Sequence, residues 1–184
     1  MRIALLLSAC LLCLNAQAAP VDVPHLGLRQ AVADAALNLP EAHLYGPVLG
    51  LPALRAGIAA LYQRWYGVDL DPARVIVTAG SSGAFVLAFT ALFDAGDRVG
   101  LGEPGYPSYR QILRALSLEP VGLPTSLENR LQPVPADFAG VELDGLIVAS
   151  PGNPTGTMLS HAALKALMDH AAGRGISFVS DEIY

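Results

Sequence analysis

Lysine, cysteine and charged residues are all scarce in this 184-residue chain. Charged residues make up 15% of it, and its 11 basic residues are scattered rather than clustered. With a net charge of -5, this distribution offers no electrostatic footprint for nucleic acid. The 53% apolar content is too high for a disordered chain and sufficient for one domain with a substantial core. We therefore expect a globular protein that acts on small molecules.

The two cysteines, Cys10 and Cys13, are the only thiols in the chain. Their C-x-x-C spacing could suggest metal or redox chemistry, but a second pair is missing. We predict no metal site from them. If the segment that contains them is removed, the mature chain has no thiol, and no disulfide is expected in any compartment.

Residues 1–19 have the pattern of a secretory signal peptide: Arg2 precedes an apolar run at 3–14, and small residues surround Ala18. The run is too short to span a bilayer, so no membrane anchor is expected. Two other interpretations stay open. Residues 7–10 fit a lipoprotein cleavage box, and the segment could be a misassigned or spliced-in start of a cytoplasmic protein.

Beyond residue 19, helical and strand-like apolar patterns alternate along the chain. The spacing over 52–66 predicts an amphipathic helix with Pro52 near its first turn and Gly67 at its end. Further helices are expected at 30–39, 84–93, 106–116 and 160–172, the last capped by Ser160, and strands at 74–78, 98–101, 119–123, 146–149 and 176–180. The proline-rich stretch 123–138 is interpreted as a surface connection. This alternation predicts an α/β fold with a mostly parallel sheet, helices on both faces and ligands beyond the carboxyl ends of the strands.

Polar clusters follow four expected strands, at residues 80–83, 103–106, 150–156 and 181–184. The first, Gly80-Ser81-Ser82-Gly83, would offer N–H groups, hydroxyls and a helix dipole to a phosphate. The same residues cap many helices without any ligand, and that alternative stays open. The cluster lacks the P-loop lysine, the G-x-G-x-x-G of a nicotinamide-binding domain and the G-x-S-x-G of a hydrolase.

Five motifs follow one another along residues 45–184: Tyr45-Gly46-Pro47 with Gly50-Leu51-Pro52-Ala53-Leu54-Arg55, Val77-Thr78-Ala79-Gly80-Ser81-Ser82-Gly83-Ala84, Glu103-Pro104-Gly105-Tyr106-Pro107-Ser108-Tyr109, Asn153-Pro154-Thr155-Gly156 and Asp181-Glu182-Ile183-Tyr184. The large domain of class I/II aminotransferases has such motifs in the same order, and residues 45–184 resemble that domain. The resemblance implies that residues 20–184 are a partial fold-type-I large domain. It also implies pyridoxal 5'-phosphate as cofactor, an amino acid and a 2-oxo acid as substrates, and a homodimer.

The resemblance assigns roles around the cofactor ring. Asp181 would pair with the protonated pyridine nitrogen, which keeps the ring an electron sink. Tyr106 would stack on the ring face, although an aromatic in the first turn of a helix that packs in the core remains an alternative for it. Asn153 and Tyr184 would both hydrogen-bond the phenolic oxygen.

It also assigns phosphate contacts. Ser81, Ser82 and the backbone of Gly83 would hold the phosphate, and Tyr45 would reach the phosphate in the partner subunit, although a buried core tyrosine remains an alternative for Tyr45. The bonds preceding Pro104 and Pro154 are candidates for cis peptides, since the resemblance includes such bends in these loops.

The family's Schiff-base lysine lies beyond its Asp-x-x-Tyr motif, and its substrate-binding arginine lies later still. Neither position occurs here, and Lys165, the single lysine, fits a solvated helix residue. We therefore expect an N-terminal fragment of an aminotransferase that is inactive by itself. A lyase on the same scaffold and a non-catalytic remnant stay open, as does the compartment: the signal-like start favours export and the resemblance favours the cytoplasm.

Overall fold

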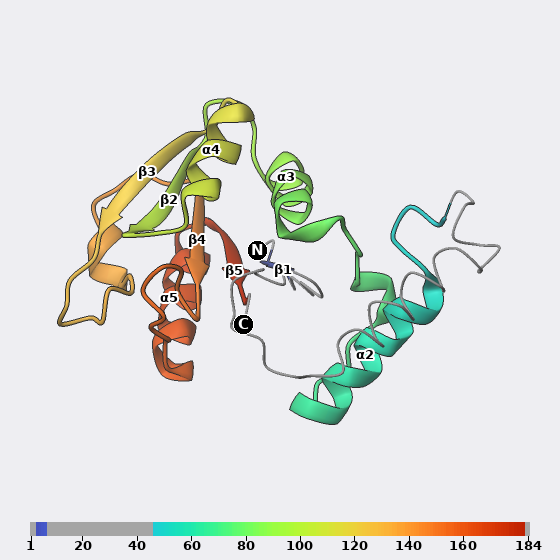
Figure 1. The fold of residues 1–184 in the computed structure, drawn as a ribbon. Helices are drawn as coiled ribbons and strands as arrows, with labels where there is room; N and C mark the ends of the chain where they lie inside the picture. The colour runs from blue at the N-terminus through green and yellow to red at the C-terminus, as the bar shows by residue number, and fades with distance from the viewer. Residues whose placement is uncertain (1–2, 7–45, 183–184) are drawn as a thin grey trace, which may run out of the picture. The chain divides into compact units, whose positions relative to one another are not determined.

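The computed structural model describes residues 3–6 and 46–182, and a parallel five-stranded sheet forms its centre (Figure 1). The strands are β1 (Ile3–Leu6), β2 (Arg98–Glu103), β3 (Glu119–Pro124), β4 (Gly145–Ala149) and β5 (Ser177–Asp181). Their order is β1-β5-β4-β2-β3, and every neighbouring pair is parallel. The predicted α/β class with a mostly parallel sheet is confirmed. Strand β1 falls within the signal-like segment.

Four α-helices and two 3₁₀ turns complete the described elements. These are α2 (Pro52–Tyr66), η2 (Pro72–Arg74), α3 (Gly80–Leu92), α4 (Pro107–Ala115), η3 (Pro135–Phe138) and α5 (His161–Gly173). Helix α2 has the predicted bounds, because Pro52 fits its first position and Gly67 ends it in the left-handed region with φ +67°. Ser160 caps α5 as predicted, since its Oγ accepts a 3.2 Å hydrogen bond from the Ala163 N–H.

The chain divides into two compact units. One contains α2 and η2, where the Arg55 guanidinium donates to the carbonyls of Val75 at 2.8 Å and Pro72 at 2.7 Å. The other contains the sheet and everything from Ala79 onward. All the contacts described below for the candidate site lie within this second unit.

The sheet has a core on each face, because successive side chains of a strand point to opposite sides. On one face, Ile147 and Val179 pack with α3 and α4; on the other, Val148 and Phe178 pack with α5. The first core comprises Phe85, Phe89, Phe93, Val99, Leu101, Tyr109, Leu113, Leu118, Ile147 and Val179. The second comprises Leu123, Phe138, Leu143, Leu146, Val148, Leu167, Ala171, Ile176 and Phe178. Helices therefore cover both faces, and the sheet is a rigid support for the loops at its ends.

The strand predicted at residues 74–78 is wrong. Val75 is extended, but residues 75–78 pair with no strand among the described residues. The Val77 N–H donates to the Leu49 carbonyl at 3.0 Å, and the Val75 carbonyl is bound by the Arg55 side chain. The strand propensity of a β-branched run is thus not enough by itself to make a strand.

Two further predictions need correction. The Gly-Ser-Ser-Gly cluster is the first turn of α3, which begins at Gly80, rather than a turn that precedes the helix. The proline-rich stretch 123–138 is more than a surface connection, because it contains the buried side chains of Gln132 and Phe138. Its prolines permit η3, whose first residue is Pro135, and this short turn places Phe138 beneath α5. The helix expected at 30–39 lies outside the described residues.

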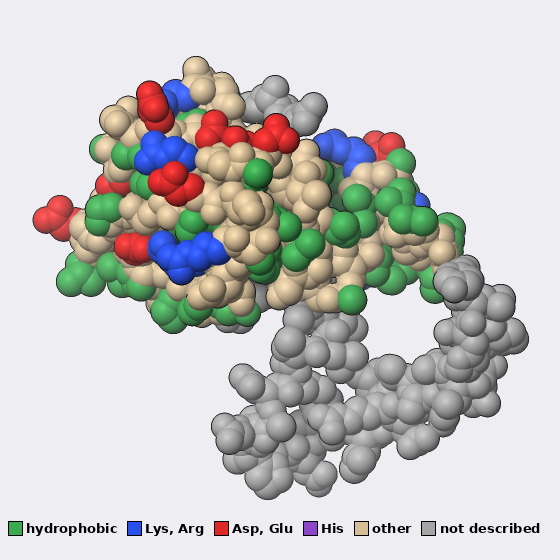
Figure 2. All heavy atoms as spheres, turned by 90° about the horizontal axis from the view of Figure 1, so that it is seen from above, with side chains coloured by type: hydrophobic (Ala, Val, Ile, Leu, Met, Phe, Trp, Pro, Cys, Tyr) green, Lys and Arg blue, Asp and Glu red, His purple; other side chains and the backbone are tan. Residues whose placement is uncertain are grey.

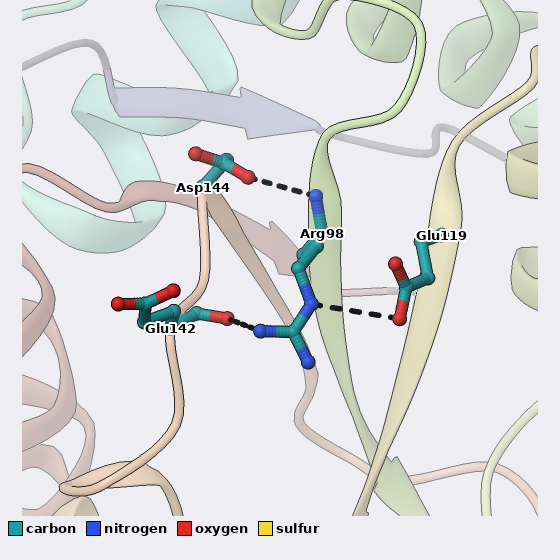
Figure 3. A network of polar contacts seen from close by, with 4 residues as sticks. All are labelled: Arg98, Glu119, Glu142 and Asp144. Carbon is teal, nitrogen blue, oxygen red and sulfur yellow. Dashed lines mark hydrogen bonds and ion pairs between the residues drawn. The ribbon is translucent and has the colours of Figure 1, made fainter.

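Arg98 connects the amino ends of three strands at the edge of the sheet opposite to the carboxyl ends (Figure 3). Its backbone N–H donates to Asp144 Oδ2 at 2.8 Å, and its Nη1 donates to the Glu142 carbonyl at 2.8 Å. Its Nε lies 3.5 Å from Glu119 Oε1. The ion pair is exposed and contributes at most about 1 kcal/mol. On the face of the molecule seen in Figure 2, acidic and basic side chains also lie next to one another.

Candidate functional site

Asp181, the last residue of β5, is a buried carboxylate with 2% of its surface exposed. Its Oδ2 accepts a hydrogen bond from the Tyr109 hydroxyl. Its Oδ1 is buried and has no hydrogen-bond partner among the described residues. Burial raises the pKa of Asp181 above its ordinary value of 3.8, and the Tyr109 hydrogen bond opposes part of that rise. A buried acceptor without a donor is costly, and such groups are typical of ligand sites.

Tyr109, which binds this carboxylate, also contacts aromatic rings on α3 and at the start of α4. It lies on α4, and its ring meets that of Phe85 on α3 edge-on, with centroids 5.1 Å apart. Its ring also meets that of Tyr106 edge-on at 5.4 Å. Tyr106 is the N-cap residue of α4 and follows the end of β2. The candidate stacking residue and the candidate carboxylate therefore contact the same tyrosine.

The candidate phosphate residues occupy the first turn of α3, one turn before Phe85. Ser81 and Gly83 are half-buried and Ser82 is exposed. The N-cap residue, Ala79, provides no side-chain hydrogen bond to this turn, and no acidic side chain lies in it. The positive end of the helix dipole at this turn suits an anion.

Asn153 belongs to the loop 150–157, which follows β4 at the same level as Asp181. The register pairs Ala149 with Asp181, and the Ser150 N–H donates to the Asp181 carbonyl at 3.0 Å. Asn153 is half-buried and, with Tyr106 and Tyr109, lines a cavity of about 30 Å³. A second hollow of about 310 Å³, between the end of β2 and the start of α4, also reaches both tyrosines. The structure thus gathers Tyr106, Asn153 and Asp181 at the carboxyl ends of β2, β4 and β5.

The loops at these strand ends contain three cis peptides. Two precede Pro104 and Pro154, as predicted, and the third precedes Pro151. Two candidate residues, Tyr45 and Tyr184, lie outside the described residues. Lys165 is on α5, exposed, and its Nζ lies 2.5 Å from Asp169 Oδ2, which agrees with its interpretation as a solvated helix residue.

Sequence reasoning assigned no role to Tyr109, which donates to Asp181, or to Gln132, whose Nε2 donates to the carbonyls of Ala149 and Thr157. Tyr109 is part of the Tyr-Pro-Ser-Tyr motif but had no assigned partner, and Gln132 lies in the stretch interpreted as a surface connection. A polar residue flanked by Leu131 and Pro133 is a weak signal of a buried hydrogen-bonding role. No group of three or more metal-ligating side chains occurs within residues 3–6 and 46–182. Nor is any helix in those ranges long and apolar enough to cross a membrane.

The fold and the strand-end motifs define a class of protein, and the comparison with protein families agrees with it. The family of class I and II aminotransferases matches residues 12–184. Because the match covers most of the chain, this protein belongs to the class I and II aminotransferase family. Members of this family generally depend on pyridoxal phosphate.

Individual relatives agree with this assignment. The chain is 46% identical over 157 residues to a valine–pyruvate aminotransferase of Mycobacterium tuberculosis, covering 84% of this chain and 40% of the relative. It is 31% identical over 175 residues to an aspartate aminotransferase of Pyrococcus horikoshii, covering 89% and 45%. A structure from Silicibacter pomeroyi, solved as that of a candidate aminotransferase, is 67% identical with a TM-score of 0.75, covering 85% and 40%. The chain thus spans less than half the length of these relatives.

Proposed function

We propose that this chain forms the cofactor-binding part of a pyridoxal-phosphate-dependent enzyme that moves an amino group between an amino acid and a 2-oxo acid. The observation that carries the proposal is the buried Asp181 carboxylate, whose Oδ1 has no donor among the described residues. A protonated ring nitrogen would supply both the missing donor and the opposite charge. Family membership and the five strand-end motifs support the same assignment.

The described residues fit the cofactor. When bound, pyridoxal phosphate supplies an electron sink for the negative charge that forms on the substrate α-carbon. Asp181 holds the proton on the ring nitrogen, because an ionised carboxylate in a buried place favours a cationic neighbour. Tyr109 keeps the carboxylate oriented through Oδ2, which leaves Oδ1 for the ligand.

The remaining candidate residues orient the cofactor. Tyr106 provides an aromatic face next to Tyr109, and Asn153 provides an amide for the phenolic oxygen, a contact that Tyr184 would share. The first turn of α3, with the hydroxyls of Ser81 and Ser82 and the N–H of Gly83, binds the phosphate. In a homodimer, Tyr45 contacts the phosphate of the cofactor that is bound in the partner subunit.

Valine and pyruvate are the first substrates to test, because the Mycobacterium tuberculosis relative is named for them. The protein that contains this chain is incubated with both, and alanine is the expected product. Ammonia release without alanine would indicate a lyase on the same scaffold. Pyridoxal phosphate that binds while neither product forms would indicate a non-catalytic remnant.

A matched pair of variants tests the carboxylate. Asp181→Asn keeps the shape and removes the charge, and it should weaken pyridoxal phosphate binding about 100-fold, the scale for leaving one partner of a buried charge pair uncompensated. Asp169→Asn makes the same change on the exposed face of α5 and should leave binding unaltered. Equal affinity of the two variants would refute the role of Asp181. Borohydride treatment followed by peptide mapping should leave Lys165 unlabelled.

A further inference from the structure

The loop that contains Asn153 is held in place by a residue from a distant segment. Gln132 lies between β3 and η3 and is 4% exposed. Its Nε2 donates to the Ala149 carbonyl at 3.2 Å, at the end of β4. The same Nε2 donates to the Thr157 carbonyl at 2.8 Å and lies 3.2 Å from Thr157 Oγ1. One buried amide therefore joins the two ends of the loop 150–157.

The loop is otherwise closed by its own backbone. The Gly152 N–H donates to the Thr157 carbonyl at 2.8 Å, and the Gly156 N–H donates to the Gly152 carbonyl at 2.7 Å. Thr155 Oγ1 and Thr157 Oγ1 are 2.9 Å apart. These bonds fix the shape of the loop. The Gln132 amide ties this closed loop to the end of β4 at Ala149. Ser150 adds two further bonds, because its N–H donates to the Asp181 carbonyl and its Oγ accepts from the Leu159 N–H at 2.9 Å.

The Gln132 amide and the Thr155 hydroxyl lie close to the backbone at Gly152. A Cβ on Gly152 would lie 3.1 Å from Gln132 Nε2 and 2.6 Å from Thr155 Oγ1. A side chain at Gly152 would therefore displace the Thr155 hydroxyl first and also crowd the Gln132 amide. Gln132 and Asn153 also line the same cavity.

We propose that Gln132 is a positioning residue for Asn153, and that its buried amide sets the place from which the Asn153 side chain meets the cofactor. The inference rests on the proposed function, since it requires pyridoxal phosphate to bind beside Asn153. The role proposed for Gln132 is to hold the loop and not to bind the cofactor directly. It acts by donating to the Ala149 carbonyl and by giving the Thr157 carbonyl a second donor beside the Gly152 N–H, and this holds the loop in one position.

Gln132→Glu tests the proposal because it preserves shape and replaces the donating NH₂ with an oxygen. At neutral pH the new carboxylate faces the carbonyls of Ala149 and Thr157, so protection of the Gly152 and Gly156 amides from hydrogen exchange should fall about tenfold. Affinity for pyridoxal phosphate should fall by a similar factor. Acidification that protonates the carboxyl restores one donor, so both losses should shrink relative to wild type.

Gln63→Glu is the matched control, because Gln63 is exposed on α2 and the same change there should alter neither quantity. Thr157→Val is a milder second variant if Gln132→Glu does not fold, and it should reduce amide protection and affinity in the same direction. Reduced amide protection with unchanged cofactor affinity would overturn the positioning role. If the wild-type protein did not bind pyridoxal phosphate at all, the proposed function would fail as well, while normal amide protection would show that the loop itself was intact.

Discussion

The unpartnered oxygen of Asp181 should destabilise the folded protein without cofactor and stabilise it once the cofactor is bound. Burial disfavours the charged form of this carboxyl and raises its pKa, and its Oδ1 has no donor among the described residues. Asp181→Asn keeps an acceptor for the Tyr109 hydroxyl and removes the charge. We therefore expect the variant to be more stable than wild type in the absence of cofactor.

The size of the effect follows from the cost of an unsatisfied buried polar group, about 1–3 kcal/mol and more when the group is charged. The introduced amide still leaves an NH₂ without a described acceptor, so part of the cost remains. A gain of about 1–2 kcal/mol in the free energy of unfolding is expected.

The pH dependence has a definite sign. The folded-state pKa of Asp181 lies above its ordinary value of 3.8. The contribution of this carboxyl to the free energy of unfolding is therefore fully present below pH 3.8, and it is lost as the pH rises through the folded-state pKa. The advantage of Asp181→Asn should therefore be small below pH 3.8 and grow as the pH rises through the folded-state pKa. Pyridoxal phosphate should reverse the order, since only the carboxylate pairs with the ring nitrogen.

Urea unfolding monitored by circular dichroism at several pH values measures this difference, with and without pyridoxal phosphate. Asp169→Asn is the control, because Asp169 is exposed and pairs with Lys165 at the surface. The reasoning would be refuted if Asp181→Asn were less stable than wild type at neutral pH without cofactor. It would equally be refuted if cofactor stabilised both proteins to the same degree.

Three other changes have expected outcomes. Tyr109→Phe removes the donor to Asp181, so it should raise the pKa of that carboxyl further, which ¹³C NMR can measure. It should also lower the free energy of unfolding near neutral pH by about 1.5–3 kcal/mol. An unchanged pKa would contradict the contact. Gly145→Ala places a Cβ 2.3 Å from the Phe93 ring and should cost about 1–3 kcal/mol in urea unfolding, whereas a neutral result would show that this core can expand. Ser160→Ala should cost about 1 kcal/mol in the same assay, and Ser160→Thr should recover most of it.

Local rules were sufficient for most of the elements. Helix α2 has the predicted bounds because proline and glycine mark its two ends, and α5 begins after its serine cap as predicted. The strands β2 to β5 fall at the expected places because each is a short apolar run between turn signals. The error at residues 75–78 has a physical reason: composition supplies propensity, but a strand also needs a neighbour, and here Arg55 binds the carbonyl of Val75.

The supports of the candidate site could not be predicted in this way. The parallel order of β5, β4 and β2 brings the ends of these strands to one edge, so Asp181, Asn153 and Tyr106 could be placed near one another from sequence alone. The residues that hold them depend on how α4 and the stretch before η3 pack across that edge. Tyr109 reaches Asp181 over 72 residues, and Gln132 reaches the loop after β4 over 17 and 25 residues. Periodicity reports only on neighbours within a turn or a strand. From sequence alone, Tyr109 is therefore indistinguishable from a core residue and Gln132 from a residue of a surface connection, because their polar partners are known only once the sheet is assembled.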